Sequence, residues 1–186
     1  MGVRKIAIIG LSPTTHDLAP WDDLSWEKWG LPWDEGYWLH YNRLFEMHKL
    51  DLIRSIPCRK RGYEERLASL DVPLYMQESY QEFSAIRYPF EDVAEVTGNY
   101  FNSSIGYMIA LAIYEKVDEI GVWGVDMKAD DEYGYQKPNT EYLLGLAKGL
   151  GIKIHIPNES PLLKFQGTGI KFGNYLPEYK GRYGWL

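Results

Sequence analysis

Short apolar runs alternate with helix-like stripes along most of the chain, and this alternation predicts the architecture. Residues 5–9 form a β-branched apolar run that stops at Gly10, a pattern typical of a buried parallel strand. Further runs predict strands at residues 25–30, 44–48, 73–77, 119–126 and 153–156. The spacing between these runs leaves room for helices that connect parallel neighbours.

The firmest helical stripe runs from Ile105 to Val117, with apolar residues at positions i, i+3, i+4, i+7, i+8 and i+12. The apolar spacing of Tyr63, Leu67 and Leu70 predicts a shorter helix over residues 62–70. A third stripe ends at Gly151, and Pro138-Asn139-Thr140 reads as its start signal. We interpret residues 78–101 as a long functional connection. Strands that alternate with helices predict an α/β protein, with a Rossmann-like, mostly parallel sheet and helices on both faces.

A chain of 186 residues fits one domain with a decorated C-terminus. We expect a Rossmann-like domain over residues 1–160. Residues 161–186 are rich in Gly and Tyr and show little periodicity. We expect this extension to pack on the domain or in a homo-oligomer.

Charge and cysteine content narrow the possible partners and the compartment. The net charge of −6 argues against nucleic-acid binding, and we interpret Arg59-Lys60-Arg61 as a solvated turn. The single cysteine, Cys58, excludes an intramolecular disulfide and fits a reducing compartment. No apolar run approaches the roughly 20 residues of a membrane span, and none resembles a secretory signal. These features predict a cytoplasmic protein without a membrane partner.

In a parallel sheet, ligands bind beyond the carboxyl ends of the strands, so the residues that follow each strand are the site candidates. The first such turn is Gly10-Leu11-Ser12-Pro13, with one Gly where the dinucleotide fingerprint has three. Gly10 lets the backbone turn sharply, and the Ser12 hydroxyl and neighbouring amides could hold a phosphate or sugar oxygen. The alternative is an ordinary strand-to-helix turn.

Asn102-Ser103-Ser104 precedes the firmest helix, where free amides and hydroxyls make an anion or ribose site. The alternative is plain N-capping by Asn102 or Ser103. Asp126 ends a strand, where a carboxylate caps the next turn or accepts from a ligand hydroxyl. No second acid is spaced to form a metal site with Asp126, and nothing in the sequence demands a metal or another cofactor.

Glu46 and His48 are two residues apart on an expected strand, so both side chains point to one face. A carboxylate beside an imidazole is a candidate catalytic acid/base pair. The alternative is a polar pair that stabilises the sheet edge. We interpret His40 and His155 as structural, and His16 as a loop residue without a partner.

Several of these segments, in this order, resemble the bacterial sialyltransferases that use CMP-sialic acid, together with related pyrophosphokinase-like and flagellin-modification proteins. The resemblance rests on three segments. They are Gly10-Leu11-Ser12-Pro13, the stretch from Asn102-Ser103-Ser104 to Asp118–Met127, and Pro138-Asn139-Thr140-Glu141 with the helix and strand that follow. It covers about two-thirds of the chain.

The resemblance implies a nucleotide-sugar pocket approached by Gly10, Ser12, Ser103 and Ser104. It also implies that two tyrosines contact the leaving phosphate, and these are Tyr133 and Tyr135. Two departures stand out: Gln136-Lys137 replaces the histidine base of the family, and Trp29-Gly30-Leu31-Pro32 replaces a turn that carries an asparagine.

Three functions remain open from the sequence. The first is a small glycosyltransferase-like enzyme that acts on a nucleotide or nucleotide-sugar. The second is a non-catalytic module that binds or sequesters a nucleotide signal. The third is a structural protein with a vestigial pocket.

Overall fold

The computed structural model describes residues 2–34, 36–37, 40–55, 62–127 and 133–164. The strands are β1 (Lys5–Ile9), β2 (Trp26–Gly30), β3 (Arg43–Glu46), β4 (Leu74–Met76), β5 (Ile86–Arg87), β6 (Glu119–Trp123) and β7 (Lys153–His155). The α-helices are α1 (Leu50–Ser55), α2 (Tyr63–Ala68), α3 (Phe90–Thr97), α4 (Ser104–Tyr114) and α5 (Tyr133–Gly149). Two short 3₁₀ helices, η1 (His16–Leu18) and η4 (Gln81–Phe83), lie in the connections.

All seven strands form one parallel sheet in the order β5-β4-β3-β2-β1-β6-β7. In the register, Lys5 of β1 lies opposite Trp26 of β2 on one side and Glu119 of β6 on the other. The chain first builds the sheet outward from β1 through β2 to β5, then returns to add β6 on the other side of β1. The strand order therefore reverses between β1 and β6, the usual position of a ligand site in such sheets.

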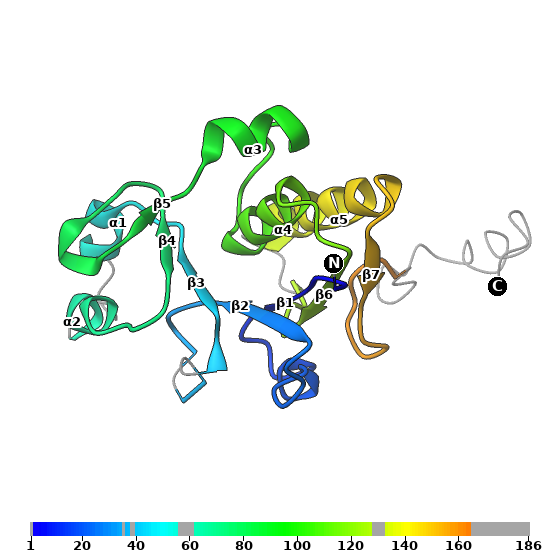
Figure 1. Ribbon diagram of the computed structural model, residues 1–186, viewed down its shortest axis with the longest axis horizontal. Coiled ribbons are helices and arrows are strands. Elements are labelled where there is room, and N and C mark those ends of the chain that lie inside the picture. Colours follow the sequence, from blue (N-terminus) through cyan, green and yellow to red (C-terminus); the bar gives the residue numbers. More distant parts are fainter. Residues whose placement is uncertain (1, 35, 38–39, 56–61, 128–132, 165–186) are drawn as a thin grey trace, which may run out of the picture.

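Apolar side chains of the sheet belong to two buried clusters, one on each face, which confirms the predicted layers. Helices α4 and α5 lie side by side over one face (Figure 1). On one face, Ile6 and Ile8 of β1 pack under α4 and α5, whose apolar faces are almost wholly buried. On the other face, Ala7 and Ile9 belong to a cluster that includes side chains of α1 and α2. Because the apolar residues of β1 are consecutive, the strand contributes to both cores, as expected for a central parallel strand. In the described part of the chain, no helix has the length and apolar character needed to cross a bilayer.

Two glycines bring the ends of β1 and β6 into direct backbone contact. A Cβ on Gly10 would lie 2.5 Å from the carbonyl oxygen of Gly124, and one on Gly124 would lie 2.2 Å from that of Gly10. Gly124 also has a φ of +63°, which side chains rarely adopt. The Gly10 amide donates to the Trp123 carbonyl at 2.9 Å. Gly10 is therefore needed for this close approach as well as for the turn that follows.

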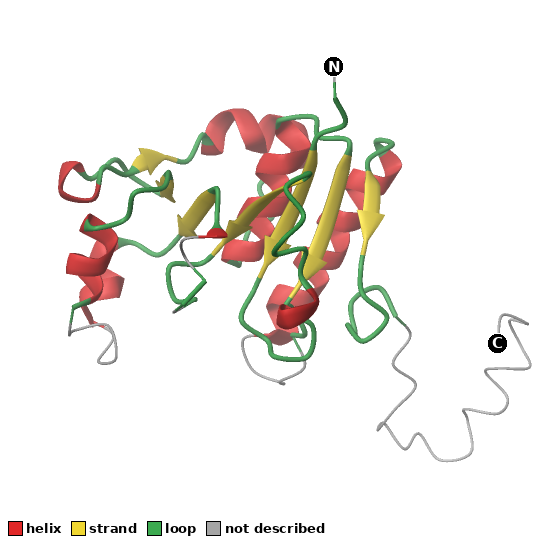
Figure 2. Ribbon diagram, turned by 60° about the horizontal axis from the view of Figure 1, so that its bottom comes forward, coloured by secondary structure: helices red, strands yellow, loops and turns green. Residues whose placement is uncertain are grey.

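Some predicted boundaries are wrong. Residues 78–101 are not one long connection, because η4, β5 and α3 occupy much of that span (Figure 2). Pro89 and Gly98 flank α3, so the two apparent loop signals are a helix start and a helix end. Phe90, Val93 and Thr97 stand at helical spacing, and Val93 and Thr97 are the buried residues of this helix.

Helix α5 begins at Tyr133, five residues before the expected start, and carries Pro138 inside it. Proline removes one intrahelical donor but does not prevent a helix where the surrounding structure compensates. The expected strand at residues 44–48 ends at Glu46, the strand at residues 119–126 ends at Trp123, and α1 was not predicted.

Candidate functional site

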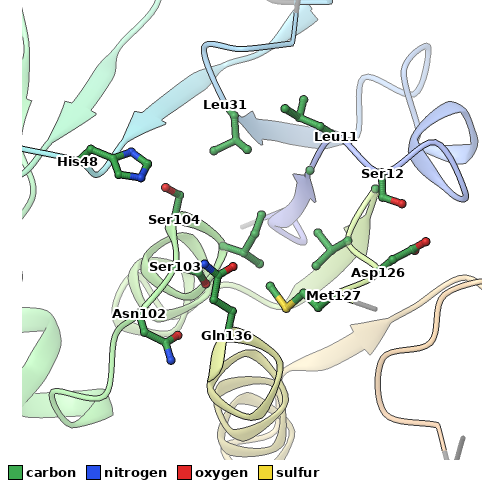
Figure 3. A pocket seen from close by; sticks show the side chains of 14 residues that line it. Leu11, Ser12, Leu31, His48, Asn102, Ser103, Ser104, Asp126, Met127 and Gln136 are labelled. Atoms are coloured by element: carbon green, nitrogen blue, oxygen red, sulfur yellow. The ribbon is translucent and has the colours of Figure 1, made fainter. Parts of the chain in front are cut away.

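A cleft of about 570 Å³ opens where β1, β3 and β6 end and α4 begins (Figure 3). Its volume lies in the range of small-molecule sites. The residues that line it are Gly10, Leu11, Ser12, Leu31, His48, Asn102, Ser103, Ser104, Ile105, Gly124, Val125, Asp126, Met127 and Gln136. Seven of the residues predicted from the sequence are in this lining: Gly10, Ser12, His48, Asn102, Ser103, Ser104 and Asp126.

The turn after β1 is fixed by backbone hydrogen bonds to β6. The Ser12 amide donates to the Gly124 carbonyl at 2.8 Å. The Gly10 and Ser12 amides are thus both used inside the protein and are not donors for a ligand. The Ser12 hydroxyl makes no hydrogen bond within the described part of the chain and lies at the pocket. A ligand would meet this hydroxyl rather than the two amides.

Two threonines beyond that turn tie it to the end of β6. Thr14 Oγ1 donates to Asp126 Oδ2 at 2.5 Å, and Thr15 Oγ1 accepts from the Gly124 amide at 2.7 Å. Asp126, only 9% exposed, therefore helps to hold the β1 turn as well as lining the cleft. Both threonines follow the Gly10–Pro13 motif directly, but nothing in their sequence pattern pointed to these contacts.

The first turn of α4 presents donors to the cleft. Ser103 is the N-cap, and its Oγ accepts from the Gly106 amide at 3.0 Å, so the capping alternative holds for Ser103. The Ser103 carbonyl accepts from the Tyr107 amide at 3.1 Å. The Ser104 and Ile105 amides precede the first intrahelical bonds and are the donors that remain for a ligand. The Ser104 hydroxyl makes no hydrogen bond among the described residues and points toward His48 (Figure 3).

Asn102 joins the starts of α4 and α5. Its Nδ2 donates to the carbonyl of Tyr135 at 2.6 Å, and its side chain points away from Ser104 and His48 (Figure 3). Asn102 therefore shapes the cleft by holding two helices together. Gln136, one residue beyond Tyr135, reaches into the lining from α5. The sequence identifies Gln136 only as the residue that replaces the family's histidine, and it does not predict that Gln136 lines the cleft.

Glu46 and His48 come together at the end of β3, although His48 lies beyond the strand. The Oε1 atom of Glu46 accepts from His48 Nδ1 at 2.5 Å and from the His48 backbone amide at 3.2 Å. Glu46 is 2% exposed and does not line the cleft, whereas the His48 side chain is 38% exposed and does. The pairing leaves the other ring nitrogen, Nε2, for the cleft. An imidazole held in this way can accept or donate a proton there.

The electrostatics of the cleft are unusual for a phosphate site. Its lining contains the carboxylate of Asp126 and the imidazole of His48 but, among the described residues, no lysine or arginine. A bound anion would therefore be stabilised by the N-terminal end of α4, which carries about half a positive charge. No three His, Cys, Asp or Glu side chains of the described residues come close enough to hold a metal ion.

The remaining candidates lie elsewhere. The Tyr135 side chain is 76% exposed and is not part of the cleft lining. The side chain of Tyr133, the basic run Arg59-Lys60-Arg61, Cys58 and residues 165–186 lie outside the described residues.

His16 has partners, contrary to expectation. Its Nε2 lies 2.9 Å from Oδ2 of buried Asp34, and its Nδ1 lies 3.0 Å from Oδ1 of Asp17. Tyr41 donates its hydroxyl proton to the same Asp34 oxygen. Burial lowers the pKa of His16, but hydrogen bonds to Asp17 and Asp34 outweigh it, so the pKa is raised. This pair ties the loop after β1 to the loop after β2.

No family model and no curated protein matches the sequence. Solved structures do match the fold. One is the sialyltransferase CstII from Campylobacter jejuni in complex with the substrate analogue CMP-3FNeuAc, with a TM-score of 0.54 and 15% identity over 83% of this chain and 80% of that chain. Another is CstII with cytidine-5′-monophosphate, with a TM-score of 0.49 and 17% identity over 84% of this chain and 80% of that chain. The chain has the fold of this glycosyltransferase neighbour.

Proposed function

We propose that this chain binds a nucleotide or nucleotide-sugar in the cleft between β1, β6 and α4 and acts as a small glycosyltransferase-like enzyme. One observation carries the proposal: a hydroxyl on each side of the cleft, the open amides of α4 and a carboxylate-bound imidazole line one ligand-sized cavity. The cavity also lies where the strand order reverses. The neighbour CstII was crystallised with CMP-3FNeuAc, which motivates the choice of ligand class.

In this proposal, the phosphate of the donor lies against the amides of Ser104 and Ile105, at the positive end of α4. The Ser12 and Ser104 hydroxyls donate to ligand oxygens. His48 Nε2 removes the proton from an acceptor hydroxyl. The acceptor oxygen then forms a bond to the sugar carbon while the bond between that carbon and the phosphate oxygen breaks. The nucleotide leaves with its phosphate, whose charge the helix terminus stabilises.

A second function is favoured by Gln136. This side chain lines the cleft at the position where the resembled family has its histidine base, and a carboxamide does not accept a proton near neutral pH. If His48 does not meet the substrate, the same cleft would bind a nucleotide without turnover. The chain would then be a sensor or a sequestering module.

The test is ligand binding together with product analysis. The purified chain is incubated with a panel of nucleoside mono-, di- and triphosphates and nucleotide-sugars, and both the melting temperature and the products are recorded. A ligand at 100 times its Kd stabilises by about 2.7 kcal/mol. For a chain of this size that raises Tm by roughly 5–10 °C. If no nucleotide raises Tm, the binding proposal is wrong.

Two variants separate binding from chemistry. Ser104→Ala should weaken the Tm shift, because a ligand donor is lost. His48→Gln should leave much of the shift but reduce turnover by about 10²–10⁴-fold, the usual contribution of a catalytic base. His155→Gln makes the same substitution on β7, outside the cleft, and should behave like the wild type. A ligand that stabilises the chain but is recovered unchanged would favour the binding module.

A further inference from the structure

Behind His48, the carboxylate of Glu46 lies between an imidazole and a phenol. Its Oε1 atom accepts from His48 Nδ1 at 2.5 Å, and its Oε2 atom accepts from the Tyr63 hydroxyl. Glu46 and Tyr63 are each only 2% exposed, so this part of the chain is shielded from water. His48 is the member that reaches the cleft. The three groups form a line from α2, through the end of β3, to the ligand site.

We infer that Tyr63 is a positioning residue for His48 and acts through Glu46. This inference rests on the proposed function, since it concerns the same imidazole. A buried carboxylate is costly unless donors satisfy its oxygens. The phenol satisfies Oε2 and thereby fixes the carboxylate plane, which directs Oε1 at Nδ1 of His48. The Nδ1 proton then stays on the Glu46 side, and Nε2 remains an acceptor toward the cleft.

The position of the Tyr63 hydroxyl is set by packing that does not involve Glu46. The Tyr63 ring stacks on Trp33 with centroids 4.3 Å apart and planes 16° apart. It also belongs to the core cluster that contains Leu67 and Ile53. Trp33 lies in the loop after β2, whose Leu31 lines the cleft. Tyr63→Phe should therefore keep the ring in place and remove only the oxygen that bonds to Glu46.

The decisive measurement is the tautomer of His48, read from ¹⁵N chemical shifts of the imidazole at a pH where the ring is neutral. In the wild type, we expect the proton on Nδ1 and a bare Nε2. In Tyr63→Phe, we expect a mixture of both tautomers. The matched control is Tyr88→Phe, which removes another buried phenol whose hydroxyl donates to the Tyr107 carbonyl at 2.9 Å. That control should lose stability without changing the His48 signals.

Kinetics with a donor found in the ligand panel give the second readout. In metal sites, removing the hydrogen-bond partner that orients a histidine lowers activity or metal affinity by about 10–100-fold. We expect a loss of kcat of the same order in Tyr63→Phe. KM and the ligand-induced Tm shift should stay unchanged, because the phenol does not line the cleft. If Tyr63→Phe matches Tyr88→Phe in both the tautomer and kcat, Tyr63 is only a packing residue. A tautomer change in a chain without turnover would uphold the positioning role and contradict the proposed enzyme.

Discussion

The first turn of α4 leaves no room for a side chain at Gly106, and this gives a sharp test of how the cleft is held. A Cβ at this position would lie 2.4 Å from Asn139 Oδ1 and 3.4 Å from both Asn139 Cγ and Ser103 Oγ. Asn139 is fully buried in α5, and its Nδ2 donates to the Tyr100 carbonyl in the loop that leads to α4. A methyl group at Gly106 would therefore push on the side chain that anchors this loop.

The expected size of the effect follows from two opposing terms. Overpacking a tight site typically costs about 1–3 kcal/mol. Replacing a helical glycine by alanine gains about 1 kcal/mol through backbone entropy. Gly106→Ala should thus lower the free energy of unfolding by up to about 2 kcal/mol. Gly145 of α5 is the matched control, because a Cβ there would meet nothing within 4 Å. Gly145→Ala should stabilise the chain by nearly the full propensity gain.

Urea unfolding of both variants, with the linear extrapolation, measures the two free energies. The double variant Gly106→Ala/Asn139→Ala should be more stable than the sum of its single changes predicts, because removing Asn139 relieves the clash. Contacting residues show such coupling at about 0.5–3 kcal/mol. If Gly106→Ala stabilises as much as Gly145→Ala, or if the double variant is strictly additive, the contact between α4 and α5 is not as tight as the geometry indicates.

Two further predictions concern the start of α4 and the loop after β1. Ser103→Ala removes the acceptor for the Gly106 amide and should lower unfolding free energy by about 1 kcal/mol, a fall in Tm of roughly 2–4 °C by calorimetry. Because the pKa of His16 is raised in the folded chain, its protonation stabilises the fold at low pH. Its contribution is full below about 6.5, the value in an unfolded chain, and is lost as pH rises through the higher folded value. The difference in unfolding free energy between wild type and His16→Gln should therefore be larger at pH 6 than at pH 8.5; a difference independent of pH would show that the pairing with Asp34 and Asp17 is not ionic.

The sequence was sufficient for β1, β2, β3, β4, β6 and β7 and for α2, α4 and α5, because most of these elements are buried and buried elements have strong periodic patterns. The β-branched run at residues 5–9 and the stripe from Ile105 to Val117 both became nearly fully buried elements. Helix α3 was missed because Pro89 and Gly98, which flank it, favour a loop when they are read in isolation. The start of α5 was misplaced because Pro138 in isolation favours a boundary. In the structure the helix continues through this residue, from Tyr133 to Gly149.

The candidate site was predictable to the extent that it depends on strand ends. Gly10 and Asp126 follow strands that neighbour each other, so the rule for parallel sheets places them together without knowledge of any side-chain contact. The partners of His16 were not predictable in this way. Asp34 lies 18 residues further on, in a loop without periodicity, and only the folded chain brings the two together. The same holds for Thr14 and Asp126.

The contact between Glu46 and His48 was predicted correctly, but strand alternation is not what brings the two side chains together. Strand alternation predicted that the two side chains share a face, but β3 ends at Glu46 and His48 belongs to the turn that follows. The pair forms because the carboxylate is buried and accepts from both the backbone amide and Nδ1 of His48, which folds the turn back onto it. Here the strand end separates their environments, so that Glu46 is buried and His48 is exposed to the cleft. The acid/base function proposed for His48 requires this difference in exposure, and the alternation pattern does not contain it.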